Sequence, residues 1–238
     1  MCGRLQLSTD PDEIAADLGA VATERTMEPR WNVPPGAVIP IVVERLEDAA
    51  PDRTRRRLPH LEFASWGLLP RWARDERLAA KTFNARSETV AEKPTFRDAF
   101  LSRRCLVPVT GYYEWSHAGG RAQPWRMHAA AGGQLVMAGL YEWWRNPDGS
   151  WRLSTTVLTA PAAGHLAQVH HRMPVFLAAA ARDAWLTVPG SRAEAIRGLH
   201  DIVADVDPDT VARHPVGASV GDVRNDDRSL AEPVAMPI

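Results

Sequence analysis

The pattern of apolar and polar positions predicts strands through the middle of the chain. Runs rich in β-branched and aromatic residues are separated by turn sequences, such as Gly132-Gly133 and the Asn-Pro-Asp-Gly of 146–149. Pro108 and Gly111 interrupt one of these runs. The predicted strands cover 37–46, 61–72 (which runs into a turn), 105–115, three segments within 124–160, and 172–178.

Helical patterns are confined to short segments. Over 9–20, Thr9 or Asp10 as a cap, Pro11 in the first turn and Gly19 at the end together predict a helix. Because strands dominate and helices are short and peripheral, we expect an α+β fold with a curled, barrel-like and mainly antiparallel sheet. The other predicted helices cover 95–104, 163–171 and 181–203.

One stretch, 50–60, is polar, rich in arginine and bounded by prolines. We expect a surface loop there with a solvated basic run, and a contact with nucleic acid is the second interpretation. No longer linker-like stretch divides the chain. The sequence therefore predicts one domain over 1–238, with its core within 2–233.

Composition places the chain among soluble globular proteins. The 238 residues are 45% hydrophobic and 24% charged, and no run reaches the ~18 apolar residues of a membrane span. With two cysteines and no signal-peptide pattern, we expect a cytoplasmic protein, and a cytoplasmic protein that binds DNA would lie with the nucleoid. A net charge of -1 argues against indiscriminate binding of nucleic acid, so such a contact needs a local basic patch.

The chain begins Met1-Cys2-Gly3-Arg4. A small second residue favours removal of Met1, which would leave Cys2 with both a thiol and a free α-amine. The ordinary pKa is about 7.7–8 for such an amine and about 8.5 for a thiol, so both are nucleophilic near neutral pH. Together they condense with an aldehyde to a five-membered thiazolidine. The alternative is that Cys2 is an ordinary packed cysteine.

Further reactive groups occur in glycine- and proline-containing segments. Asn84 and Arg86 would share one face of an extended segment, as would His170 and Arg172. Glu114 or His170 would serve as the general acid–base that imine chemistry needs. Each residue also has a structural interpretation: Asn84 in a turn, the arginines in surface ion pairs and His170 in the core.

An aldehyde carried on a nucleic acid would require phosphate contacts and stacking surfaces. Arg86 and Arg172 suit the phosphates, and Trp66 and Trp115 suit the bases. Ordinary core packing is the alternative for Trp66. The chain contains no glycine-rich phosphate loop and no CxxC, HExxH or GxSxG motif, so we expect neither a metal nor another cofactor.

Eight motifs, in order along the whole chain, resemble those of the SRAP family, the SOS-response-associated proteins. The resemblance implies processing of abasic sites in single-stranded DNA. The N-terminal cysteine would condense with the ring-opened sugar aldehyde and form a thiazolidine cross-link that shields the lesion. The motifs are MCGR (1–4), WNVPPG (31–36), WGLLPRWARD (66–75), NARSETVAEKPTFRDAF (84–100), RRCLVPVTGYYEW (103–115), AGLYEW (138–143), VHHRMPVFL (169–177) and VRNDD (223–227).

The resemblance also implies a role for each site residue. Cys2 would be the nucleophile at both its amine and its thiol, and Asn84 would hold the N-terminus and the adduct. Glu114 would be the general acid–base, because Glu142, in a second Tyr-Glu-Trp, fits the glycine-led motif less well. His170 would move a proton at the sugar oxygen. The residues implied to contact DNA are Arg4, Trp66, Arg86, Trp115 and Arg172.

The chain departs from the family pattern at 32–37, at Thr110 and at His171. These departures bear on DNA affinity and on the pKa of His170. Two other functions stay open from the sequence: a thiol peptidase that uses Cys2 to release its own initiator, and a non-covalent single-strand-binding module. Because the chain has no coiled-coil pattern, we expect a monomer with neither a metal nor a membrane partner.

Overall fold

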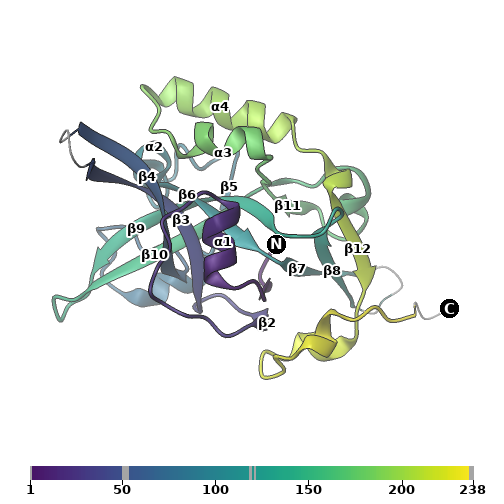
Figure 1. Ribbon diagram of the computed structural model, residues 1–238. Helices are drawn as coiled ribbons and strands as arrows, with labels where there is room; N and C mark the ends of the chain where they lie inside the picture. The colour runs from purple at the N-terminus through teal and green to yellow at the C-terminus, as the bar shows by residue number, and fades with distance from the viewer. Residues whose placement is uncertain (1, 50–53, 118–119, 121, 236–238) are drawn as a thin grey trace.

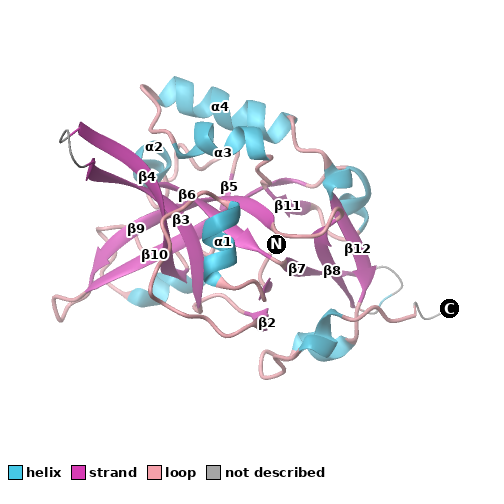
Figure 2. Cartoon of the chain, in the orientation of Figure 1, coloured by secondary structure: helices cyan, strands magenta, loops and turns pink. Residues whose placement is uncertain are grey.

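Two sheets form the centre of the computed structural model, which describes residues 2–49, 54–117, 120 and 122–235 (Figure 1). The first sheet has the strand order β12-β8-β7-β1-β2, and all its pairings are antiparallel. Helices lie on the outside of the molecule (Figure 2). The strands of this sheet are β1 (Leu5–Leu7), β2 (Arg30–Val33), β7 (Gly111–Ser116), β8 (Gln123–Ala129) and β12 (Val211–Pro215).

The second sheet closes on itself. Its order is β11-β10-β4-β3-β6-β9, and a further pairing of β9 with β10 completes a ring of five strands, β10-β4-β3-β6-β9. The pairings of β10 with β4 and with β5 are parallel, and the other strand pairings of this sheet are antiparallel. The expected α+β fold with a barrel-like, mainly antiparallel sheet is therefore confirmed. The strands are β3 (Val38–Ala49), β4 (Thr54–Trp66), β5 (Asn84–Arg86), β6 (Arg104–Val109), β9 (Leu135–Arg145), β10 (Trp151–Pro161) and β11 (Arg172–Pro174).

Small and branched side chains fill the interior of the ring. Ile41, Val107 and Val157 are fully buried in one core cluster. Gly139 lies where two strands approach most closely, since a Cβ added there would be 2.6 Å from the Val107 Cγ2 and 2.7 Å from the Cys105 Sγ. A larger residue would have to push the strands apart, so glycine is needed at this position.

The helices begin and end near their predicted positions. The Asp10 side chain accepts the Asp12 N–H, which identifies Asp10 as the cap of α1. The segment predicted as a helix over 163–171 forms a shorter 3₁₀ turn. The helices are α1 (Pro11–Asp17), α2 (Arg97–Ser102), α3 (Ala179–Leu186) and α4 (Arg192–Ala204), with 3₁₀ turns η1 (Glu76–Lys81), η3 (Gly164–Gln168), η4 (Pro208–Thr210), η5 (Ala218–Gly221) and η6 (Arg228–Ala231).

The loop expected over 50–60 is wrong from Thr54 onward. Residues 50–53 lie outside the described part of the chain, but Thr54 and its successors belong to β4, which pairs with β3 along its whole length (Figure 1). Arg56 is opposite Glu47 in this pair, so the charges of the basic run meet acids across the strands. A strand exposed on both faces has no apolar alternation, and its sequence therefore resembles a loop.

Candidate active site

Cys2 lies beside β7. The two strands β1 and β7 are antiparallel, and the Tyr113 N–H donates to the Arg4 carbonyl at 2.9 Å. Continuing this register toward the N-terminus brings Cys2 to the part of β7 that carries Glu114. The Cys2 side chain is 1% exposed and belongs to the same core cluster as the ring interior.

Asn84 reaches Cys2 from a separate strand. β5 pairs in parallel with β10, with Asn84 opposite Val157. The Asn84 Nδ2 donates a hydrogen bond of 2.6 Å to the Cys2 carbonyl. The Asn84 Oδ1 is buried and has no hydrogen-bond partner in the described part of the chain. The amide thus holds the backbone of Cys2 and keeps an acceptor beside it.

Glu114 is a buried carboxyl next to Cys2. It is 4% exposed, and burial raises its pKa above the ordinary value. Burial, and then the charge of Glu114, also raise the pKa of the Cys2 thiol well above its usual range. Both shifts favour the neutral, protonated forms. Near neutral pH the pair therefore consists of a thiol and a carboxyl that retains its proton more readily than an exposed one.

His170 follows η3 and faces Glu114. The Arg172 N–H lies 2.9 Å from the His170 Nδ1, and the Arg172 carbonyl lies 3.1 Å from the same nitrogen. Because a backbone N–H can only donate, we assign Nδ1 as the acceptor and place the ring proton of the neutral imidazole on Nε2. The same Nδ1 lies 3.9 Å from the Glu114 Oε1. Burial lowers the pKa of His170, which favours the neutral ring at neutral pH. His171 stacks beside it, with ring centroids 4.2 Å apart.

The Arg172 side chain is held inside the protein. It is 8% exposed, its guanidinium pairs with both carboxylate oxygens of Glu88, and its Nη2 donates to the Thr159 carbonyl at 2.6 Å. Its Nη1 and Nη2 already have partners, whereas its Nε has none in the described residues, so the expected contact of Arg172 with a phosphate stays a prediction. Glu88 follows the strand of Asn84, so the ion pair joins the segments that carry Asn84 and His170.

Trp66 is also interior. It is 0% exposed, its ring packs edge-on against Phe83 with centroids 5.8 Å apart, and its Nε1–H donates to the Phe83 carbonyl at 2.9 Å. A base stacks on an exposed face of a ring, and neither face of Trp66 is free. The expectation that Trp66 stacks on DNA is therefore corrected: Trp66 packs in the core cluster that contains Cys2.

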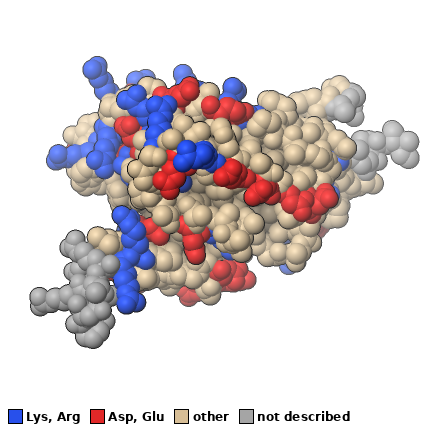
Figure 3. Space-filling view, turned by 90° about the horizontal axis from the view of Figure 1, so that it is seen from above, with Lys and Arg blue, Asp and Glu red and all other residues tan. Residues whose placement is uncertain are grey.

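The remaining expected DNA contacts lie nearer the surface. Arg86 is exposed at the end of β5, and Trp115 is half-buried. Arg4 lies over the Trp115 ring, 5.7 Å from its centroid, and donates to the Asn32 Oδ1 at 2.7 Å. Lys and Arg side chains gather over one half of the face shown in Figure 3, so basic patches exist despite a net charge of -1.

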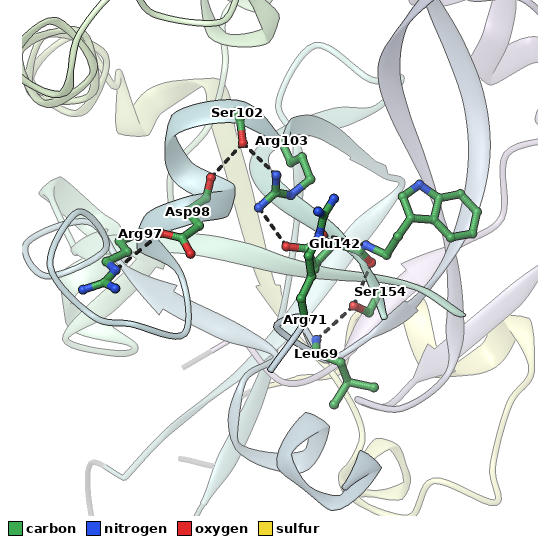
Figure 4. Close-up of polar contacts among 9 residues, drawn as sticks. Leu69, Arg71, Arg97, Asp98, Ser102, Arg103, Glu142 and Ser154 are labelled. Carbon is green, nitrogen blue, oxygen red and sulfur yellow. Dashed lines mark hydrogen bonds and ion pairs between the residues drawn. The ribbon is translucent and has the colours of Figure 1, made fainter. Parts of the chain in front are cut away.

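Glu142, the second carboxyl in a Tyr-Glu-Trp, occupies a different place. Its side chain is 4% exposed and lies between two arginines, with Arg71 Nε at 3.2 Å and Arg103 Nη2 at 2.8 Å (Figure 4). Its Oε1 also accepts the Trp143 N–H at 3.0 Å. Glu114 is thus the carboxyl of this pair that lies beside Cys2.

Sequence reasoning missed the partner of Arg172. It expected surface ion pairs for the arginines and named no acid for Arg172. The spacing of Arg172 two residues after His170 was the available signal, but the identity of the acid depends on how β5 and β11 meet through β10. In the described part of the chain, no group of three or more His, Cys, Asp or Glu side chains could hold a metal, and no helix could span a membrane.

Comparisons with known proteins agree over nearly the whole chain. The model of the family "SOS response associated peptidase (SRAP)" matches residues 1–223. The abasic site processing protein YoqW of Bacillus subtilis is 30% identical over 235 residues, which cover 98% of this chain and 99% of that one. The abasic site processing protein HMCES of Gallus gallus is 30% identical over 246 residues, covering 90% of this chain and 69% of HMCES.

Solved structures share the fold. A protein from Bacteroides thetaiotaomicron superposes with a TM-score of 0.81 at 23% identity, covering 98% of this chain and 100% of that chain. A protein from Bordetella bronchiseptica does so with a TM-score of 0.73 at 27% identity, covering 91% of this chain and 100% of that chain.

Proposed function

Since the chain belongs to the SOS response associated peptidase (SRAP) family, we propose that it processes abasic sites by bonding covalently to the DNA that carries them. Relatives that match almost the whole chain are named abasic site processing proteins. The proposed substrate is the ring-opened sugar aldehyde in single-stranded DNA. The proposed product is a thiazolidine that Cys2 forms once Met1 has been removed.

One observation carries this proposal: three separate segments converge on Cys2. Asn84 binds its carbonyl, Glu114 lies close enough to act on the pKa of its thiol, and His170 faces Glu114. A cysteine that only fills space needs apolar neighbours. An amide, a carboxyl and an imidazole around one cysteine instead supply the groups that imine chemistry uses.

The α-amine of Cys2 is the first nucleophile in the proposed reaction. Its nitrogen attacks the aldehyde carbon C1′, and the resulting carbinolamine loses its hydroxyl as water to give an imine. Glu114 supplies the proton that makes the hydroxyl a leaving group, since burial raises its pKa and so favours its protonated form. The raised pKa of the Cys2 thiol prevents it from competing in this step.

The thiol closes the ring in the second step. Glu114, now a carboxylate, accepts the thiol proton while the sulfur bonds to the imine carbon, and the proton then moves to the nitrogen. One aldehyde and one aminothiol thus give one thiazolidine and one water. The Asn84 Oδ1, buried and without a partner in the described residues, would accept an N–H of the Cys2 amine and fix its direction.

His170 and the nearby surface would hold the sugar and the strand. With Nδ1 occupied by the Arg172 N–H, the Nε2–H is the ring donor that would hydrogen-bond to the departing sugar oxygen during ring opening, while that oxygen gains the proton that the C1′ hydroxyl releases. Arg86 is exposed at the end of the strand that carries Asn84, where it would meet a phosphate. Arg4 and Trp115 form the adjoining cation–π pair, a surface suited to a base.

The test is the intact mass of the purified protein before and after incubation with a single-stranded oligonucleotide that carries one abasic site. We expect loss of Met1 and then an adduct of protein plus oligonucleotide minus one water. Cys2→Ser should lose the adduct. Cys105→Ser is the matched control, because Cys105 is the other free and buried cysteine, and it should keep the adduct.

A protein that loses Met1 and forms no adduct would exclude the covalent proposal. The burial of Cys2 is the observation that favours a second candidate, a non-covalent single-strand-binding protein. For that candidate, Cys2→Ser would leave DNA binding unchanged, and no species would survive denaturation.

A further inference from the structure

Four side chains line an open surface cavity at the end of the β9–β10 hairpin, which projects from the ring (Figure 1). The cavity has a volume of about 500 Å³ and is lined by Arg71, Trp143, Arg145 and Trp151. Its walls are indole rings and the stems of two arginines. We call this group of four residues the tryptophan cradle.

The register of the hairpin explains why three of these side chains share one face. Trp151 is directly opposite Arg145, and Trp143 lies two residues before Arg145 on the same strand. Side chains at alternate positions and in opposed pairs lie on one face of a sheet. Glu142, Trp144 and Arg152 occupy the other face of the hairpin. The cradle therefore lies on the face opposite the buried Trp144.

Arg71 enters the cradle from the turn that follows β4. Gly67 has φ 143, and a Cβ added there would lie 2.5 Å from the Ala79 carbonyl oxygen. Only glycine fits this close approach, which packs η1 against the end of β4. Arg71 then extends over Glu142, with 69% of its side chain exposed (Figure 4).

Two large indoles are exposed at this place. Trp151 is 61% exposed and Trp143 is 37% exposed. Burying an indole gains more than burying any aliphatic side chain, so exposed tryptophans that line one hollow indicate a binding surface. Trp144, their neighbour, is 2% exposed and packs in the core, which shows that the fold can bury an indole in this hairpin.

The charge around the cradle is positive. Glu142 is shared by Arg71 and Arg103, which leaves one positive charge in excess, and Arg145 has no ion pair within the described residues. Asp148, in the turn of the hairpin, instead accepts the N–H and the hydroxyl of Ser150. Guanidinium groups beside indoles match a phosphate beside a base.

We propose that the tryptophan cradle is a second nucleic-acid site, which takes unpaired bases of single-stranded DNA between Trp143 and Trp151 and their phosphates at Arg71 and Arg145. Stacking on indoles accepts any base, since every base has a π face. The site adds affinity without sequence preference. This proposal rests on the proposed function in one respect: the strand held in the cradle is the one whose abasic site lies at Cys2.

The distance between the two sites sets how long a strand must be to reach both. Asn84 is opposite Val157 on β10, and Trp151 lies six residues earlier on the same strand. At 3.2–3.4 Å per residue the separation is about 20 Å. At about 3.4 Å per stacked nucleotide this is roughly six nucleotides, so a di- or trinucleotide would occupy only one site, whereas a strand of roughly 20 nucleotides would reach both.

The experiment measures the affinity of full-length Cys2→Ser protein for labelled oligothymidine of roughly 3 and roughly 20 nucleotides. We expect Trp143→Ala with Trp151→Ala to weaken binding of the long strand by about tenfold or more. Binding of the short strand should change little. Replacing both tryptophans by phenylalanine should restore most of the affinity, because a flat ring remains.

Matched variants exclude simpler explanations. Arg145→Ala should lower the slope of log affinity against log salt for the long strand by about 0.7, the loss of one phosphate contact. Arg192→Ala removes an exposed arginine of α4 and should leave that slope unchanged. Thermal unfolding of each variant checks that the fold is intact.

Unchanged affinity of the double alanine variant for the long strand would overturn the proposal and leave the cradle to a protein partner. The proposed function fails separately. If the wild-type chain forms no adduct while its affinity for the long strand still depends on Trp143 and Trp151, the cradle stands without the covalent chemistry. If the adduct forms and the affinity for the long strand does not depend on Trp143 and Trp151, the covalent chemistry stands and the proposal for the cradle fails.

Discussion

The tripeptide Tyr-Glu-Trp occurs twice in this chain, and its two copies have different environments. Glu114 and Glu142 are both buried in strands, at 4% and 3% exposure. Arginines contact Glu142 from two sides and hold both of its carboxylate oxygens. Glu114 faces a thiol and a neutral imidazole, and its pKa is raised. The comparison teaches that the neighbours of a buried carboxyl, and not its local sequence, decide whether it stabilises or reacts.

Exchanging each carboxyl for an amide should produce the largest difference. Glu114→Gln should slow formation of the adduct by about 10²–10⁴, the usual contribution of a general acid–base. Glu142→Gln should leave the rate per folded molecule unchanged, although it weakens the fold. Quenched time courses with an abasic oligonucleotide measure both rates. Equal losses of rate in the two variants would contradict the distinction between the two sites.

Glu114→Gln should also change how the stability of the fold depends on pH. The pKa of Glu114 is raised in the folded state, so the folded protein binds the proton more tightly and stability falls as pH rises above 4.5, the ordinary value of a glutamate. Glu114→Gln should remove this fall. Unfolding temperatures of both proteins from acidic to neutral pH test the sign: the variant should gain on the wild type as pH increases.

Removing an arginine from Glu142 should cost stability according to the burial of that arginine. Arg103 is 18% exposed, and Arg103→Met leaves the buried Glu142 carboxylate with one arginine partner in place of two. We expect the free energy of unfolding to fall by about 3 kcal/mol. Arg71 is 69% exposed, and Arg71→Met should cost less than about 1 kcal/mol because solvent screens the pair. Urea denaturation measures the two losses, and similar values would show that burial does not decide them.

The smallest effect should come from the ion pair that joins the Asn84 and His170 segments. Arg172 lowers the pKa of Glu88 to about 2, so this pair stabilises the fold above pH 4.5 and is lost as pH falls toward 2. Glu88 is 45% exposed, which limits the contribution to about 1 kcal/mol.

Glu88→Gln also tests a positioning role. It should loosen the Arg172 N–H contact to the His170 Nδ1 and lower the adduct rate a few-fold. Nitrogen chemical shifts of His170 would show a mixture of tautomers. Glu92→Gln, an exposed carboxyl in the same loop, is the control and should change neither measurement. A slower reaction with an unchanged tautomer would exclude the positioning role.

Local signals in the sequence predicted the elements well. Asp10 caps its helix as expected, and the run predicted as a strand over 105–115 is present as β6 and β7. The break between them lies at Thr110, whereas β6 continues through Pro108, where the sequence predicted an interruption. Side-chain exposure was harder to predict. Trp66 and Arg172 are interior because β10 collects partners from four different parts of the chain, and no spacing within one segment reports such a meeting.

Because the chain is synthesised from its N-terminus, β1 is made before most of the segments that it pairs with. β1 pairs with β2 and with β7, and Cys2 also needs Asn84 and the segment of His170. At a synthesis rate of about 5–20 residues per second, the ribosome takes roughly 6–20 seconds to reach β7. The N-terminus is undocked during this interval, and the aminopeptidase can reach it. Once the protein has folded, Cys2 is 1% exposed, so the interval before β1 pairs is the time at which Cys2 is most accessible.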